Sequence, residues 1–136
     1  NVYKMVLPVD VENFQLEFVD LSEVPLVTDR RRMEIVFNNL ISNAIKYSTS
    51  DSQIEILTKT NDHTFQVEVQ DHGIGIPDED QEHLMDRFFR GKNAINIPGT
   101  GLGLHIVSKY VERMNGDISF VSKLNEGTTF KLIFKR

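Results

Sequence analysis

The side chains best suited to chemistry fall in three segments that follow one another along the 136-residue chain. The first runs from Asn39 to Ser48 and carries two asparagines and a lysine, the second runs from Asp71 to Pro77, and the third from Gly99 to Leu104. Amide oxygens bind hard metal ions, a carboxylate accepts hydrogen bonds, and glycine-rich backbone admits phosphate. Together these groups predict a site for ATP with Mg²⁺.

The asparagine segment reads as part of an amphipathic helix. At about 100° per residue, Asn39, Asn43 and Lys46 fall in one arc beside the apolar stripe, with Tyr47 close by. Asparagine oxygens suit Mg²⁺, and Lys46 offers a point charge for phosphate. The alternative is a surface helix with two asparagines on its polar side by chance. Because asparagine is a poor helix former, two in mid-helix favour a functional role.

Asp71 lies where a predicted strand runs into Gly73 and Gly75. A carboxylate accepts hydrogen bonds, so it suits the exocyclic amino group of adenine, whereas guanine has a carbonyl there and would leave an unpaired acceptor costing about 1–3 kcal/mol. Asp71 therefore predicts selection of ATP over GTP. A hairpin turn or a calcium loop is the alternative, but Gly75 and Pro77 supply no side-chain oxygen for calcium.

The third segment, Gly99-Thr100-Gly101-Leu102-Gly103-Leu104, opens a predicted helix. Backbone N–H groups at such a helix start attract phosphate. The spacing is neither the Gly-x-Gly-x-x-Gly of a dinucleotide fold nor a P-loop, because no Gly-Lys-Ser/Thr follows. Just upstream, Arg90 and Lys92 are candidates for the terminal phosphate, although basic loop residues are often only solvated.

The elements that must position these segments follow from periodicity and from turn residues. The first half of the chain is predicted to form a strand at Phe14–Asp20, a helix at Arg30–Tyr47 and a hairpin of Gln53–Lys59 and Thr64–Gln70. The second half is predicted to form a short helix starting at Pro77, a mobile loop at Gly91–Gly99, a helix at Leu102–Met114 capped by Asn115-Gly116, and strands at Asp117–Leu124 and Thr128–Lys135. This order predicts an α/β sandwich: a mixed, largely antiparallel sheet with three helices packed on one face, formed by a single domain over residues 1–136.

Composition narrows the class of protein. Hydrophobic residues make up 40% and charged residues 26%, as in soluble globular domains. A net charge of −5 argues against a nucleic-acid partner, and the absence of cysteine excludes disulfides and thiolate metal sites. No apolar run is long enough to span a membrane. Because the chain opens on Asn1, not Met, we expect a fragment or a processed piece.

In order and spacing, the segments resemble the ATP-binding domain of sensor histidine kinases, within the superfamily of gyrase, MutL and histidine kinases. Asn39 to Ser48 resembles the family's N box, Asp71 to Ile76 its G1 box, and Leu84 to Arg90 its F box, with Met85 where the family usually has Phe. Glu126 to Phe130 resembles a third glycine element. The resemblance implies an α/β fold with a mobile ATP lid.

The resemblance also implies roles for individual residues. Asn43 becomes the principal magnesium ligand with Asn39 as a second, and Asn39 and Lys46 become the catalytic residues beside the phosphates. Asp71 becomes the adenine-binding carboxylate. The residues assigned to nucleotide binding are Asn43, Tyr47, Asp71, Gly73, Gly75, Ile76, Arg90, Lys92, Gly99, Thr100, Gly101, Leu102, Gly103, Leu104 and Thr128.

Asn39 separates the activities within this superfamily. Hydrolases usually carry Glu there as a general base toward water, which Asn cannot replace. A neutral histidine needs no such base, so transfer of the γ-phosphate to histidine is favoured. The acceptor motif, a histidine followed directly by an acidic residue, occurs at none of His63, His72, His83 and His105.

The resemblance therefore implies that the acceptor lies on a separate helical dimerisation domain, with a response regulator as the next partner. It implies a monomeric fragment in the cytoplasm, from a parent protein either free or anchored to a membrane. The alternative function is a non-catalytic ATP-binding regulatory module of the same fold.

Overall fold

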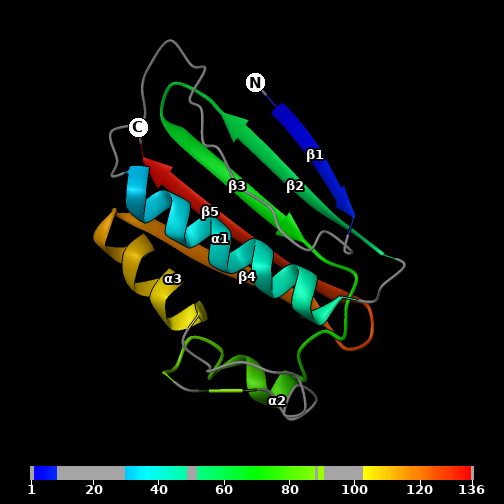
Figure 1. Ribbon diagram of the computed structural model, residues 1–136. Helices are drawn as coiled ribbons and strands as arrows, with labels where there is room; N and C mark the ends of the chain where they lie inside the picture. The colour runs from blue at the N-terminus through cyan, green and yellow to red at the C-terminus, as the bar shows by residue number, and fades with distance from the viewer. Residues whose placement is uncertain (1, 9–29, 49–51, 88, 91–102, 136) are drawn as a thin grey trace.

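A computed structural model describes residues 2–8, 30–48, 52–87, 89–90 and 103–135. Its centre is a five-stranded sheet in the order β1-β2-β3-β5-β4 (Figure 1). The strands are β1 (Val2–Pro8), β2 (Gln53–Thr60), β3 (Thr64–Gln70), β4 (Gly116–Lys123) and β5 (Gly127–Lys135). Every neighbouring pair of described strands is antiparallel. The described sheet is therefore fully antiparallel, in keeping with the prediction of a mixed, largely antiparallel sheet.

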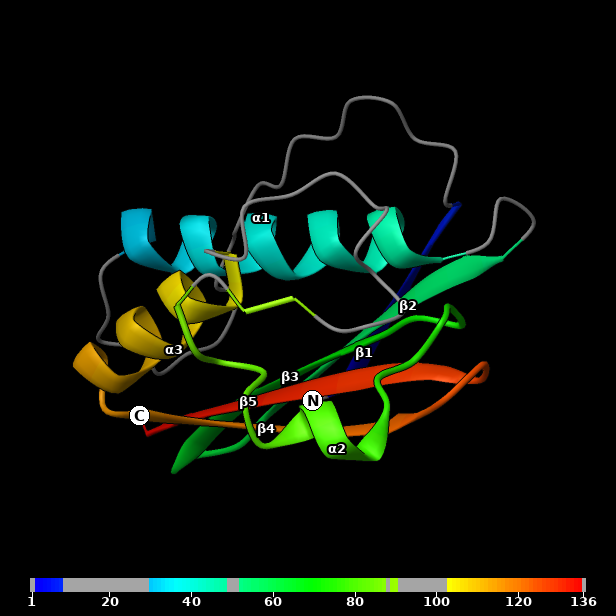
Figure 2. The same cartoon turned by 90° about the horizontal axis from the view of Figure 1, so that it is seen from below.

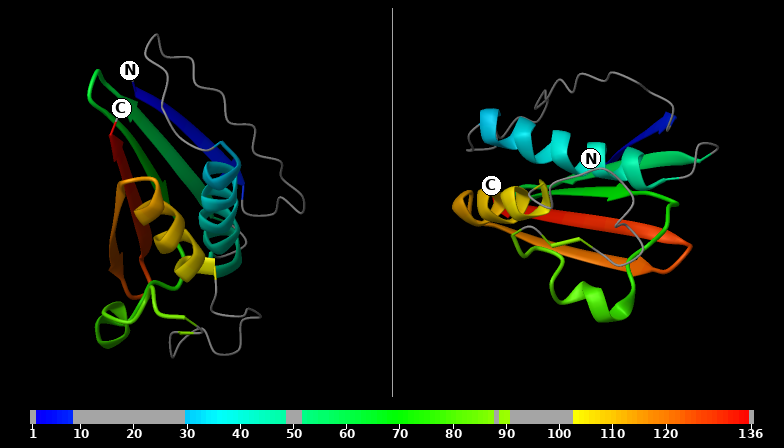
Figure 3. Two further views of the ribbon diagram at one scale, coloured as in Figure 1. Left: turned by 90° about the vertical axis from the view of Figure 1, so that its left-hand side faces the viewer. Right: turned by 60° about the horizontal axis from the view of Figure 1, so that its bottom comes forward.

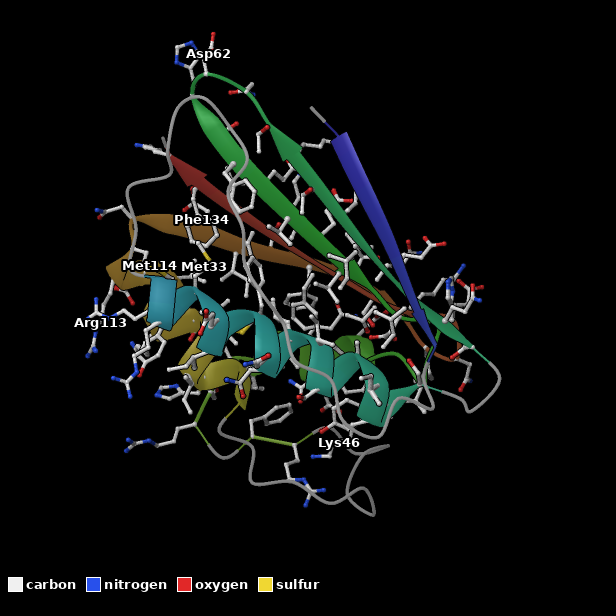
Figure 4. All side chains as sticks on the ribbon, turned by 45° about the horizontal axis from the view of Figure 1, so that its top comes forward. Met33, Lys46, Asp62, Arg113, Met114 and Phe134 are labelled. Carbon is white, nitrogen blue, oxygen red and sulfur yellow. The ribbon has the colours of Figure 1, made fainter. Side chains whose placement is uncertain are left out.

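Two helices cover one face of this sheet, α1 (Arg30–Tyr47) and α3 (Gly103–Arg113) (Figure 2). The short α2 (Asp78–Gln81) lies off that face, beyond one end of the sheet, as Figure 3 shows. Strand residues alternate between the two faces, so Phe65, Val67 and Val69 of β3 point into the core. The same core holds Met33 of α1 and Phe134 of β5, which are labelled in Figure 4.

Helix α1 forms over the predicted residues because its apolar stripe packs in the hydrophobic core with residues of the sheet and of α3. Met33, Val36, Leu40 and Ala44 recur at helical spacing, and all are buried. The polar residues between them face outward or toward α3. No described helix is long and apolar enough to cross a lipid bilayer.

The sequence-based elements agree with the structure over most of the described chain. The helix at Arg30–Tyr47 is confirmed to the residue, and both predicted hairpins form. Helix α3 ends at Arg113, Asn115 follows it with a left-handed φ of 56°, and Gly116 already begins β4. The sequence analysis missed β1, and its predicted strand at 14–20 and loop at 91–99 lie outside the described residues.

Candidate functional site

Asp71 lies directly after β3 and is 8% exposed. Its Oδ1 accepts hydrogen bonds from the backbone N–H groups of Gly73 at 3.0 Å and Thr128 at 3.2 Å. Its own N–H donates to the Thr128 carbonyl at 2.9 Å. The carboxylate is thus held between β3 and β5, and no hydrogen bond from the described part of the chain reaches Oδ2. One acceptor oxygen remains for a donor such as an adenine amino group.

The electrostatics of Asp71 reflect this position. Burial raises the pKa of the carboxyl above its ordinary value, while the N–H groups of Gly73 and Thr128 and the nearby His72 pull the pKa back down. Desolvation is the largest of these effects. A carboxylate kept in such surroundings is maintained at a cost to folding, which is typical of functional sites.

Glycines let backbone segments meet around Asp71. A methyl group built on Gly73 would lie 2.1 Å from the carbonyl oxygen of Tyr47, and one on Gly127 would lie 2.1 Å from that of Asp71. Gly127 also has a φ of 126°, which residues with a Cβ rarely adopt. Gly75, at φ 69°, meets the Lys123 carbonyl in the same way. These contacts close the loop after β3 against α1 and against the turn between β4 and β5.

Two residues that the sequence analysis missed hold the rest of this loop. Ser122 Oγ accepts a hydrogen bond from the Ile76 N–H at 2.9 Å and lies 2.8 Å from Thr128 Oγ1. Gln81 Nε2 donates to the Ile76 carbonyl at 3.0 Å. Thr128 is 6% exposed. No local pattern marks Ser122 or Gln81, since each acts on residues of other elements.

We call this group the carboxylate end of the site, and it comprises Asp71, Gly73, Ile76, Ser122, Gly127 and Thr128. Thr128, which the sequence analysis assigns to nucleotide binding, is bonded to Asp71 through its backbone, and its proximity to adenine stays a prediction. Ile76 contributes its backbone here, because both its N–H and its carbonyl are bonded to neighbouring elements.

The predicted metal-binding asparagines meet the start of α3. A methyl group on Gly103 would lie 3.2 Å from Asn39 Oδ1 and 3.7 Å from Asn43 Nδ2. Asn39 Nδ2 donates to the Ile35 carbonyl at 2.8 Å, which directs its oxygen away from its own helix backbone. Asn43 is half-buried, and its side chain makes no hydrogen bond within the described part of the chain. Two amide groups therefore lie beside the first residue of a helix.

The two described cations among the predicted site residues are Lys46, in the last turn of α1, and Arg90. Lys46 is exposed, with its Nζ 5.5 Å from the centre of the Tyr47 ring (Figure 4). Desolvation lowers the pKa of Lys46, and the nearby Arg90 lowers it further. Burial raises the pKa of Tyr47, while Arg90 lowers it. The charge of Arg90 therefore acts on both Lys46 and Tyr47.

We call Asn39, Asn43, Lys46 and Gly103 the amide end of the site. The last turn of α1 joins the two ends. Tyr47 follows Asn43 by one helical turn, and its carbonyl accepts a hydrogen bond from the Ile74 N–H at 3.1 Å. A ligand that reached from Asp71 to Asn43 would therefore follow the C-terminal end of α1.

Of the remaining predicted residues, some pack against the hydrophobic core and others lie outside the described residues. Leu104 packs its side chain against the hydrophobic core, as does Met85, which confirms that Met85 can replace the family's Phe in packing. The His105 ring lies 3.2 Å from the Met85 carbonyl through Nδ1 and so ties α3 to this segment. Phe88 and five predicted nucleotide ligands lie outside the described residues: Lys92, Gly99, Thr100, Gly101 and Leu102.

Comparison with known proteins now decides the family. The model of the histidine kinase-, DNA gyrase B- and HSP90-like ATPase family matches residues 28–136. The chain belongs to this family. It is 42% identical over 119 residues to the signal transduction histidine-protein kinase ArlS of Staphylococcus haemolyticus (strain JCSC1435), which covers 85% of this chain and 26% of that protein. ArlS of Staphylococcus aureus (strain USA300) is 41% identical over 105 residues, or 76% of this chain and 23% of that protein.

The chain thus spans about a quarter of the length of these ATPase-family relatives. Among solved structures, the catalytic domain of histidine kinase ThkA matches with a TM-score of 0.67 and 31% identity, over 79% of this chain and 69% of that one. The mycobacterial sensor histidine kinase MprB shares the fold, with a TM-score of 0.74 and 24% identity over 81% of this chain and 76% of that one. These matches confirm the resemblance to the ATP-binding domains of sensor histidine kinases, and with it the predicted α/β fold.

Proposed function

We propose that this chain is a single ATP-binding domain, residues 1–136, that binds Mg-ATP and transfers the γ-phosphate to a histidine on a separate dimerisation domain. The observation that carries the proposal is the Asp71 carboxylate, whose Oδ1 is occupied by two backbone N–H groups while Oδ2 is left as an acceptor. Adenine offers an amino donor to such an oxygen, whereas guanine has a carbonyl at the corresponding position.

The amide end fits a magnesium ion by the chemistry of its donors. Asn39 and Asn43 offer neutral hard oxygens, and Mg²⁺ in nucleotide sites takes few protein ligands beside water and phosphate oxygens. Within the described residues, no group of three or more His, Cys, Asp or Glu side chains could hold a metal. When bound, Mg²⁺ supplies neutralisation of the phosphate charge. The asparagines would hold it beside the start of α3.

The phosphate transfer itself asks little of this domain beyond position and charge. The imidazole nitrogen of the acceptor forms a bond to the γ-phosphorus, the bond from that phosphorus to the bridging oxygen breaks, and ADP leaves. Lys46 and Arg90 would stabilise the charge on the phosphoryl oxygens. Asn39 accepts no proton in this step, in keeping with a nucleophile that is already neutral. A response regulator would then take the phosphoryl group from the acceptor histidine.

Calorimetric titration with a non-hydrolysable ATP analogue, with and without Mg²⁺, tests the nucleotide site. We expect magnesium-sensitive binding of the ATP analogue, much weaker binding of the GTP analogue, and a loss of about a hundredfold for Asp71→Asn, because the substituted amide offers a donor where an acceptor is needed. Equal affinity for both nucleotides would contradict the role of Asp71.

Incubation with ATP and a separately supplied dimerisation domain of ArlS type tests the transfer. We expect acid-labile phosphohistidine on that domain, and none when its acceptor histidine is replaced. Firm ATP binding without any phosphohistidine would instead support the non-catalytic regulatory module.

A further inference from the structure

The Ser122 hydroxyl contacts three other residues within the described part of the chain, at the carboxylate end of the site. Its Oγ receives the Ile76 N–H at 2.9 Å, lies 3.2 Å from the Gly127 carbonyl oxygen, and lies 2.8 Å from Thr128 Oγ1. Ser122 and Thr128 face each other across β4 and β5 in register. The Ser122 hydroxyl therefore links the loop after Asp71, through Ile76, to the first two residues of β5, Gly127 and Thr128.

The single proton of this hydroxyl fixes the direction of each bond. The Ile76 N–H can only donate, and the Gly127 carbonyl can only accept. Ser122 must therefore accept from Ile76 and give its own proton to Gly127. For the third contact to be a hydrogen bond, Thr128 must donate its proton to Ser122. The Thr128 hydroxyl then has only lone pairs left, and it acts as an acceptor toward anything else.

Thr128 is also bonded to Asp71 twice through its backbone, so its hydroxyl belongs to the same end of the site as the carboxylate. In this arrangement Thr128 Oγ1, like the ionised Asp71 carboxylate, has lone pairs and no proton to offer a ligand. A base that carries a hydrogen-bond donor is favoured by both of them, and a base with a carbonyl at the corresponding position is opposed by both.

We propose that Ser122 is a positioning residue that determines base specificity, because it holds the Thr128 hydroxyl as an acceptor and fixes the loop through Ile76. This inference rests on the proposed function, and it assigns to Ser122 a part in the preference of the site for adenine. Ser122 itself contacts no base in this arrangement, so it acts through Thr128 and Ile76.

The test compares Ser122→Ala with Ser122→Thr, which restores the hydroxyl, and with Ser119→Ala. Ser119 lies on the same strand and its side chain is exposed. Affinities for analogues of ATP and ITP are measured by calorimetry, since hypoxanthine replaces the adenine amino group by a carbonyl. We expect Ser122→Ala to reduce the ATP-to-ITP preference about tenfold, which equals about 1.4 kcal/mol, because Thr128 becomes free to donate. Ser122→Thr and Ser119→Ala should keep the preference within about twofold of the wild type.

Amide hydrogen exchange gives a second readout that needs no nucleotide. Loss of the Ser122 hydroxyl should speed exchange at the Ile76 N–H, with little change at the buried strand β3. An equal loss of affinity for both nucleotides in Ser122→Ala would overturn the proposal and make Ser122 a purely structural residue, and an unchanged preference would overturn it as well. If the wild type binds neither nucleotide, the proposed function has failed, and this outcome is distinct from failure of the role of Ser122.

Discussion

At the carboxylate end of the site, backbone groups carry nearly every contact, whereas at the amide end the side chains of α1 meet the start of α3 with few hydrogen bonds among them. Asp71 is buried and bonded to two N–H groups, and its surroundings are closed by Gly73 and Gly127. Asn43 is half-buried and Lys46 is exposed. If the proposed function holds, base recognition depends on the folded backbone, which fixes Asp71. Recognition of phosphate and metal would then depend on side chains that make few hydrogen bonds with one another.

The largest effect should come from breaking the carboxylate end. In Gly127→Ala the new methyl group would meet the Asp71 carbonyl at 2.1 Å, and the residue would keep an unfavourable φ of 126°. We expect a loss of roughly 3 kcal/mol in the free energy of unfolding, measured by urea denaturation.

Gly103→Ala is the matched change at the amide end. Its methyl group would lie 3.2 Å from the Asn39 side chain and at ordinary contact distance, 3.7 Å, from that of Asn43. The free energy of unfolding should therefore change by less than about 0.5 kcal/mol. Equal destabilisation by the two substitutions would contradict the contrast between the ends.

A smaller and more selective effect is expected for Asn43→Ala. Loss of one hard oxygen ligand should weaken binding of the ATP analogue about tenfold in the presence of Mg²⁺ and leave binding in EDTA nearly unchanged. Calorimetry with and without the metal measures both. Ser42→Ala, an exposed neighbour on α1, serves as the control and should change neither value. A loss of equal size in EDTA would show that Asn43 does not act as a ligand of the metal.

Acidification should affect folding and binding in opposite directions through Asp71. Burial raises its pKa, so the ionised carboxylate destabilises the fold above that pKa relative to the protonated form. As the pH falls through the raised pKa toward the ordinary value, protonation relieves this destabilisation and the contribution of Asp71 to stability increases. Binding of the ATP analogue should weaken over the same window by several-fold to about tenfold, because the carboxyl oxygen that accepts from adenine becomes protonated.

Both curves are measured relative to Asp71→Asn, which cancels the titration of the nucleotide. The difference in affinity between the two proteins should become smaller as the pH falls through this window. A wild type and a variant with parallel pH profiles for binding would contradict a buried, ligand-accepting carboxylate.

The smallest effect is expected for Lys46→Met. Because Lys46 is exposed, its interaction with phosphate is screened by water and salt, and we expect a loss of only a few-fold in affinity at about 0.15 M salt. The loss should shrink further as the salt concentration increases. Thermal denaturation should show no change, since the substitution leaves the core intact. A salt-independent loss would place Lys46 in closer contact with the phosphate than the amide end suggests.

Local pattern was enough for the parts of this protein that depend on neighbouring residues in the chain. The apolar positions of α1 recur at helical spacing, so its bounds at Arg30 and Tyr47 were predictable. The hairpin of β2 and β3 alternates apolar and polar residues around a turn. The chemistry of Asn39, Asn43 and Asp71 also allowed a prediction of the kind of ligand, since each group acts through its own donor or acceptor atoms. Those individual roles stay predictions.

Contacts between distant segments decided the rest. Strand β1 forms an edge of the sheet by pairing with β2, about fifty residues later, and Val2–Pro8 contains no turn or period strong enough to show this alone. Ser122 looks like any strand serine until register places it opposite Thr128 and beneath the Ile76 N–H. The sequence by itself determined which groups are available for ATP and metal. Only the tertiary structure decided which of them share hydrogen bonds, because proton direction and steric closeness depend on chain segments that meet only after folding.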